Sequence, residues 1–333
     1  MRESEWRRRA AREGLRKLLA PLALGVVMSA LPRLVYSSFP DKPIQLLVGQ
    51  GAGGSTDTVT RTFAEFLGKH LGSPVIVRNM EGAGGRMMLR HVSSQASDGY
   101  SLCMVVTPSY INVQLLRSPD WDLNEFTYIQ GVGGGDSNGL IVPYDSEIES
   151  FADLIELAKK GPLAVGSTAP GSNSWLLGVL LAAYAGDLRI SPVPFGSGME
   201  ASLAIAGSHV PVGIVSTVNI PDLLKEKQVR AIAVSSSERL SYLPEVPTFV
   251  ELGYPDIVTE ANMYLAAPAG LPDDVRGILE DAARKAASDP EFLTLAEKQG
   301  FSVRRLSAME AERAFREDYR KTQALLKAAG EID

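Results

Sequence analysis

The chain has 333 residues, with 33 basic and 39 acidic side chains and a formal net charge of −6 at pH 7. This acidic balance argues against binding to nucleic acid or to anionic membrane surfaces, and the length allows two domains. The single cysteine, Cys103, cannot form an internal disulfide and is expected to be a buried small hydrophobe, while no Cys or His cluster has metal-ligand spacing.

The first 38 residues have the pattern of a secretory signal peptide. Seven basic and three acidic side chains precede an almost wholly apolar run of fourteen residues, Leu18–Leu31. This run is shorter than the ~20 residues that span a bilayer as a helix. We therefore expect a cleaved signal peptide over residues 1–38 and a periplasmic mature protein of net charge about −11. An uncleaved membrane anchor is the alternative.

Short apolar runs alternate with amphipathic segments along the rest of the chain. We predict buried strands at Ile44–Val48, Val75–Val77, Leu102–Val106, Gly139–Val142, Leu163–Gly166, Gly213–Ser216 and Arg230–Val234. We predict helices at Thr56–Leu71, Gly85–Gln95, Phe151–Lys160, Ser174–Ala185 and Gly198–Ala206, with a mostly helical segment at Pro272–Ala329. The alternation indicates an α/β fold with a largely parallel sheet, and the glycine-rich Gly131–Gly139 is predicted to cross between two domains.

The most distinctive segment is the turn after the first predicted strand. The sequence GQGAGGSTD (Gly49–Asp57) joins that strand to an amphipathic helix. Outward backbone N–H groups and the helix dipole make such a turn a site for an anion. The candidate ligand-binding residues here are Gly53, Gly54, Ser55, Thr56 and Asp57. Asp57 either stabilises the helix start through the dipole or binds an amine of the ligand.

Two further small-residue turns follow predicted strands. In open α/β sheets, ligands bind beyond the carboxyl ends of strands, so turns from two domains could hold an anionic group at each end of a small dicarboxylate. Alternatively, the hydroxyl groups of each turn only cap a helix. The candidate residues are Thr107, Pro108 and Ser109 in one turn, and Ser167, Gly171, Ser172, Asn173 and Ser174 in the other.

An enzyme is the main alternative. Gly49, Gly51 and Gly54 match the dinucleotide-binding fingerprint, and Glu81 follows the next strand, so the turn could serve a dinucleotide-dependent oxidoreductase. The predicted export argues against it, because nicotinamide cofactors are not pooled outside the cytoplasm. None of the three histidines, His70, His91 and His209, has an evident Ser or Cys partner. We therefore expect no catalysis, no cofactor and no metal.

From Phe39 onwards the chain resembles the periplasmic solute-binding receptors of tripartite tricarboxylate transporters, also called Bug-type receptors. The motifs occur in order: Phe39–Asp57, Leu71–Gly85, Asp98–Leu102, Pro192–Gly198, Arg230–Val234, Leu243–Pro255 and Ala267–Pro272. The resemblance implies a two-domain periplasmic-binding-protein (Venus flytrap) fold with a mainly parallel sheet in each domain. We place domain 1 at residues 39–138 and 261–333, and domain 2 at residues 139–260.

The resemblance also implies a function. Such a receptor captures a small carboxylate, either an organic acid or an acidic amino acid, and delivers it to a large and a small membrane subunit. The loops that hold the ligand in this family correspond to Gly53–Asp57, Thr107–Ser109 and Ser167–Ser174, and Phe195 would pack on the ligand body. We expect a monomer, and a ligand sensor without a transport role is a further alternative. The chain departs from the family pattern at Gly49–Ala52, at Gly196 and at Asn262.

Overall fold

The computed structural model describes residues 39–186, 188–299 and 301–333, so the predicted signal peptide lies outside the described residues. The strands are β1 (Ile44–Val48), β2 (Val75–Asn79), β3 (Ser101–Thr107), β4 (Thr127–Pro143), β5 (Leu163–Thr168), β6 (Ile190–Phe195), β7 (Val212–Ser216), β8 (Val229–Val234), β9 (Glu260–Ala267) and β10 (Ser302–Leu306). The helices are α2 (Ser55–Leu71), α3 (Arg86–Ser93), α4 (Ser109–Arg117), α5 (Phe151–Lys160), α6 (Asn173–Tyr184), α7 (Gly198–Ala206), α8 (Pro221–Lys225), α9 (Asp273–Ala287), α10 (Pro290–Lys298) and α11 (Ala308–Ala328).

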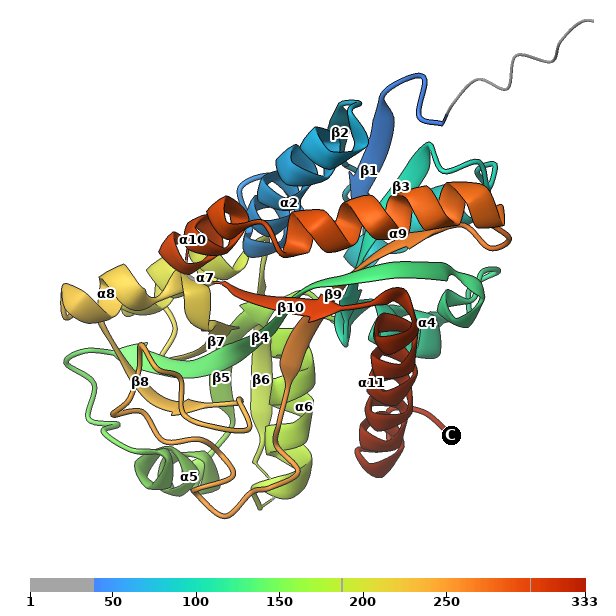
Figure 1. The fold of residues 1–333 in the computed structure, drawn as a ribbon. Coiled ribbons are helices and arrows are strands. Elements are labelled where there is room, and N and C mark those ends of the chain that lie inside the picture. The colour runs from blue at the N-terminus through green and yellow to red at the C-terminus, as the bar shows by residue number, and fades with distance from the viewer. Residues whose placement is uncertain (1–38, 187, 300) are drawn as a thin grey trace, which may run out of the picture. The chain divides into compact units, whose positions relative to one another are not determined.

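The strands follow the order β2-β1-β3-β9-β4-β7-β5-β6, and both β8 and β10 pair with β4. Strands β2, β1 and β3 run parallel, as do β7, β5 and β6. Strands β4, β8, β9 and β10 pair antiparallel. The α/β class is confirmed, but the sheet is more mixed than expected, because four antiparallel strands fill its centre (Figure 1).

The predicted crossover at Gly131–Gly139 is itself strand. It lies inside the 17-residue strand β4, whose first part pairs with β9 and β10 and whose last part pairs with β7 and β8. The glycine-rich part of this strand was not predicted, because glycine usually weakens a strand. Here glycine leaves room for β10: a Cβ at Gly131 would lie 2.7 Å from the Cβ of Leu306.

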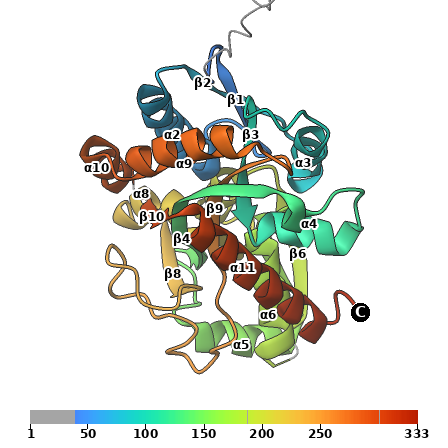
Figure 2. The ribbon, with the colours of Figure 1, turned by 45° about the vertical axis from the view of Figure 1, so that its right-hand side comes forward.

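Three hydrophobic cores cover the sheet. The first draws its buried residues from 44–132 and 261–315. The second draws on 140–257 and includes Leu326, and the third lies on the opposite face of the β4–β7 region, since Leu140 and Ile141 point to different cores. Helix α11 contributes Phe315 to the first core and Leu326 to the second, so one helix packs on both (Figure 2).

Most predicted elements lie within one or two residues of their observed bounds. Capping boxes, whose Ser-x-x-Asp and Ser-x-x-Glu spacing is visible in the sequence, form between Ser150 and Asp153 and between Ser307 and Glu310. Strand β6 was not predicted, because Pro192 and Pro194 disfavour a strand; it is tolerated since β6 is an edge strand that pairs only with β5. Cys103 is buried, as expected.

Candidate functional site

The first predicted turn connects β1 to α2 and leaves the start of that helix without a side-chain cap. Gly54 occupies the N-cap position with extended backbone angles, and no side chain caps the helix there. The first N–H groups of a helix have no intrahelical partner, so those at the start of α2 can bind an anion. Gly53 and Gly54 are exposed, Ser55 is half-buried and Thr56 is buried.

Asp57 fixes the shape of this turn. Its Oδ2 accepts hydrogen bonds from the backbone N–H of Gly53 at 2.9 Å and from Arg61 Nε at 2.8 Å, and its Oδ1 accepts from Asn79 Nδ2 at 2.9 Å. Burial alone would raise the pKa of Asp57, but the hydrogen bonds from Arg61, Gly53 and Asn79 outweigh it and keep the pKa below its ordinary value. The carboxylate is therefore already paired with a cation, and the Gly53 N–H is already used.

Tyr110, a fully buried residue of α4, stabilises the same turn through hydrogen bonds to its first two residues. The backbone N–H of Gly49 donates to its Oη at 3.1 Å, and the Oη donates to Gln50 Oε1 at 2.9 Å. A Cβ at Gly49 would lie 2.5 Å from that oxygen, so the glycine is required by the close approach. Burial raises the pKa of Tyr110, which keeps its phenol protonated and able to donate. The sequence alone did not single out Tyr110.

The second predicted turn begins α4, but its threonine faces the protein interior. Thr107 is fully buried and donates from Oγ1 to Asp318 Oδ2 at 2.5 Å. Asn262 Nδ2 and Tyr264 Oη donate to the same oxygen, at 3.0 and 2.9 Å. The Thr107 hydroxyl thus helps to satisfy a carboxylate from α11. Ser109, by contrast, is half-buried at the first position of α4, where the N-cap residue Pro108 supplies no side-chain cap.

In the third predicted turn one hydroxyl group caps α6 and the others form hydrogen bonds within the turn. Ser172 Oγ accepts from the backbone N–H of Trp175 at 3.1 Å. Ser174 Oγ accepts from the backbone N–H of Thr168 at 3.1 Å and lies 2.7 Å from the Thr168 hydroxyl. Ser167 Oγ donates to the carbonyl of Thr168 at 3.2 Å. Ser172 therefore caps α6, whereas Ser167 and Ser174 bond to Thr168 within the turn, and none of these bonds prevents contact with a ligand.

Helix α4 brings the third turn to the first two. Asn112 Nδ2 donates to the carbonyl oxygen of Gly171 at 3.0 Å, and both groups are buried. A Cβ at Gly171 would lie 3.3 Å from Val113 Cγ2, and a Cβ at Gly84 would lie 2.9 Å from the same atom. Residues before α2, before α3 and before α6 therefore meet around α4, at the carboxyl ends of β1, β2, β3 and β5.

Two buried amide oxygens near this meeting point have no hydrogen-bond partner. They are Oδ1 of Asn112 and Oδ1 of Asn173, within the part of the chain that the structure describes. A buried polar atom without a partner costs about 1–3 kcal/mol, so such atoms call for a ligand or water. Asn173 was predicted as a site residue, whereas Asn112 was missed because it lies one helical turn beyond the predicted loop.

Phe195 lies farther along the same sheet edge. It ends β6, opposite Thr168 of β5. Its side chain is half-buried and packs against the third hydrophobic core. A Cβ at Gly166 would lie 3.1 Å from its ring. The Phe195 ring therefore packs against β5 at the residue that directly precedes Ser167 of the third turn.

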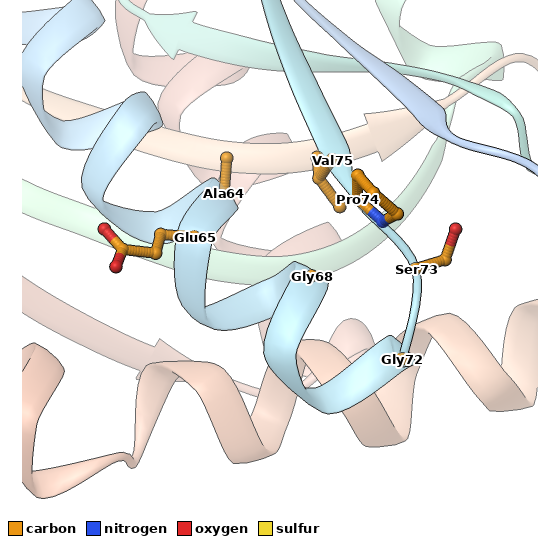
Figure 3. Close-up of a pocket in the computed structure, with 7 residues that line it drawn as sticks. All are labelled: Ala64, Glu65, Gly68, Gly72, Ser73, Pro74 and Val75. Carbon is orange, nitrogen blue, oxygen red and sulfur yellow. The ribbon is translucent and has the colours of Figure 1, made fainter.

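A hollow of about 430 Å³ lies away from these turns, at the carboxyl end of α2 (Figure 3). Gly68 and Gly72 face Pro74 and Val75 across it, and the Glu65 carboxylate points away from them. The last carbonyl groups of a helix repel an anion, so this hollow does not suit a carboxylate.

Within residues 39–186, 188–299 and 301–333, no group of three His, Cys, Asp or Glu could hold a metal ion. None of the helices in those ranges has the length and apolar character needed to cross a membrane.

Several solved structures share this fold, and some of them are described as periplasmic binding proteins. The periplasmic binding protein BugD is 26% identical, with a TM-score of 0.80 over 88% of this chain and 99% of BugD. MatC of Rhodopseudomonas palustris, solved with bound malate, is 24% identical with a TM-score of 0.78, over 86% of this chain and 100% of MatC. Rpa4515 of R. palustris, solved with adipate, is 24% identical with a TM-score of 0.79, over 88% of this chain and 98% of Rpa4515. The fold is therefore that of the α/β periplasmic binding proteins.

Residues 59–331 match the TctC profile, described as the tripartite tricarboxylate transporter family receptor, and the chain belongs to this family. The family resemblance seen in the sequence motifs is thereby confirmed. Because these receptors are binding proteins and not enzymes, the oxidoreductase alternative for the Gly49–Gly54 turn is set aside.

Proposed function

We propose that this chain is a periplasmic receptor that binds a small carboxylate between its converging turns and delivers it to the membrane subunits of a tripartite transporter. The observation that carries the proposal is the meeting of the α2 and α4 starts with the Gly171 turn around Asn112. Helix starts without side-chain caps favour anions. The relatives MatC and Rpa4515 were solved with malate and with adipate, which are both dicarboxylates.

The candidate residues take different roles in this proposal. The free N–H groups that follow Gly54, together with Ser55 and Thr56, hold one carboxylate. Ser109 and the N–H groups that follow Pro108 contribute beside them. Asp57 and Thr107 support the turns from within, because their polar atoms are already bonded to Arg61 and to Asp318. From the third turn, Ser167 and Gly171–Ser174 face the ligand from the second domain, and Phe195 covers its carbon chain.

Binding is coupled to closure of two domains in this proposal. The first hydrophobic core belongs to residues 39–138 and 261–333, and the others mainly to residues 139–260. A ligand that touches turns from both domains gains contacts only in the closed state, so it shifts the population towards that state. Strands β4 and β9 and helix α11 join the two parts, and any hinge lies in them.

Two measurements test the ligand class. Native mass spectrometry of the mature protein, followed by mass analysis of what is released on denaturation, identifies a retained ligand. Thermal shift assays with mono-, di- and tricarboxylates cover the case in which no ligand is retained. The proposal is supported if a carboxylate is released in the first measurement or raises the melting temperature in the second. The absence of any response to the whole carboxylate panel would overturn it.

Gly54→Asp tests the first turn. Gly54 has a φ of −76°, and a Cβ there would meet only the Gly51 carbonyl at 3.5 Å, so aspartate fits. An N-cap aspartate accepts hydrogen bonds from the same N–H groups that we assign to the ligand, and relative to glycine it stabilises the helix by about a few tenths of a kcal/mol. We expect stability to be kept and carboxylate affinity to be lost. Gly277→Asp adds the same charge at an open, exposed site and should leave affinity unchanged.

A further inference from the structure

We propose that a small cavity beside β4 is a subsite for a protonated amine of the ligand, with the Asp136 carboxylate as its partner. This inference rests on the proposed function, because it assigns the second charged group of the same bound molecule. The preferred ligands are then organic acids whose amine lies several bonds from the carboxylate.

The cavity has a volume of about 40 Å³. This exceeds the roughly 10–15 Å³ that one water-sized group needs, and an ammonium group is of that size. Residues from distant parts of the chain line the cavity: Val59, Gly133, Gly134, Asp136, Val218, Leu240, Tyr242, Met263, Phe301 and Ser302. Asp136 is the only carboxylate among these residues.

No basic side chain lines the cavity, so Asp136 has no cationic partner there. Ser216 Oγ donates to its Oδ1 at 2.7 Å, and this serine ends β7. Burial raises the pKa of Asp136 to about 6, although the hydrogen bond from Ser216 opposes the rise. Asp136 is half-buried. A partly desolvated carboxylate without a cation is unfavourable, and a ligand ammonium group would relieve that cost.

The buried carboxylate of Asp57 and the half-buried carboxylate of Asp136 therefore differ in their partners. Asp57 is paired with Arg61 and closes the first turn, so it cannot accept a ligand amine without losing that pair. Asp136 keeps its charge unpaired and faces a cavity. The structure thus favours Asp136 over Asp57 as the amine-binding residue.

The position of Val59 sets the length of the ligand. Ser55 and Val59 are four residues apart, so they lie on one face of α2, about 6 Å apart along the helix axis. A carboxylate at the helix start and an amine in the cavity are then separated by roughly one helical turn. A five-carbon chain with the carboxylate and the amine at opposite ends spans roughly 6 Å when extended, from C–C bonds of about 1.5 Å.

Two charged groups on the neighbouring strands have partners of their own. Arg304 of β10 donates to Asn262 Oδ1, and Glu260 of β9 accepts from Ser237. Tyr242, the other titratable residue that lines the cavity, shares a 2.9 Å hydrogen bond with Thr217, and burial raises its pKa. Below neutral pH, Asp136 is therefore the cavity-lining group whose charge changes.

The test compares three five-carbon acids by calorimetry: pentanoate, 2-aminopentanoate and 5-aminopentanoate. We expect the wild-type protein to bind 5-aminopentanoate about 10- to 100-fold more tightly than pentanoate, the range given by one charge-assisted hydrogen bond. The 2-amino isomer should gain little, because its amine lies beside the carboxylate. Asp136→Asn keeps the acceptor for Ser216 and should remove the preference, while Glu65→Gln, which removes an equal charge elsewhere, should keep it.

The pH dependence repeats the test on the unchanged protein. The preference for 5-aminopentanoate should fall as the pH drops from 7 to 5, because Asp136 then gains a proton. Equal affinity for pentanoate and 5-aminopentanoate at pH 7, or a preference that survives Asp136→Asn, would overturn the amine subsite. If dicarboxylates still bind in that case, the proposed function stands; if no carboxylate of any kind binds, both proposals fail.

Discussion

Asn112 of α4 holds the turn at Gly171, 59 residues farther along the sequence, through a buried hydrogen bond of 3.0 Å from its side-chain amide to the backbone carbonyl. The other amide atom of Asn112, Oδ1, is buried without a partner. One side chain therefore both fixes the third turn against α4 and presents an acceptor at the proposed site. This double role makes Asn112 the most informative residue to replace.

Asn112→Ala should lower the free energy of unfolding by about 1–3 kcal/mol, because the buried Gly171 carbonyl loses its partner. Carboxylate affinity should fall as well, since the third turn is no longer held in place. Urea unfolding and calorimetry measure the two effects. Asn124→Ala serves as a control, because Asn124 donates to Asp122 away from the turns and is only partly buried. Equal effects of the two substitutions would contradict the role of Asn112.

The pairing of Asp57 with Arg61 predicts a specific dependence of stability on pH. The folded-state pKa of Asp57 lies below its ordinary value of 3.8, so its ionised form stabilises the fold above that value. This contribution is lost as the pH falls through the folded-state pKa. The difference in unfolding free energy between the wild type and Asp57→Asn should therefore be largest near neutral pH and shrink below about pH 4. Urea unfolding from pH 3 to 7 checks this, and a difference that is constant with pH would refute it.

The parts of the fold that local chemistry determines could be predicted from the sequence. Helix α5 was found with its correct bounds because Ser150 and Asp153 signal its start and Gly161 its end. Strand β1 was found because an apolar run enters a glycine turn. Strand β4 was only partly found, because its glycines make sense only against the side chains of β10, which are distant in the sequence.

The candidate site was predicted in outline and not in detail. The three turns lie where strands end, which the sequence pattern indicates directly. The roles of individual side chains depend on partners from far along the chain: Asp318 binds Thr107 across 211 residues, and Tyr110 binds Gly49 across 61. No local pattern encodes such pairs. Asp136, which we propose as an amine partner, was not singled out for the same reason, because its cavity forms only where β4 meets α2 and the segment after β7.

The two hydroxyl residues of the second turn should respond differently to substitution. Thr107→Val removes a hydrogen bond to the Asp318 carboxylate and should cost about 1.5–3 kcal/mol of unfolding free energy. Ser109→Ala should leave stability nearly unchanged but lower carboxylate affinity roughly three- to tenfold, as expected for one neutral hydrogen bond. Parallel urea unfolding and calorimetry separate the effects. Loss of affinity in Thr107→Val at full stability would show that its hydroxyl faces the ligand instead.

The close packing of Gly85 against Tyr110 predicts a large cost for a single methyl group. Gly85 has a φ of +95°, and a Cβ there would collide with the Tyr110 ring that supports the first turn. Gly85→Ala should therefore be destabilised by both the backbone strain and the overpacking, by about 2–5 kcal/mol in total. Gly253→Ala isolates the first cost, because Gly253 has a φ of +92° and open space around its Cβ position. It should lose only about 1–2 kcal/mol. Urea unfolding of both variants gives the difference, and equal losses would mean that the Tyr110 ring yields and does not hold the turn rigidly.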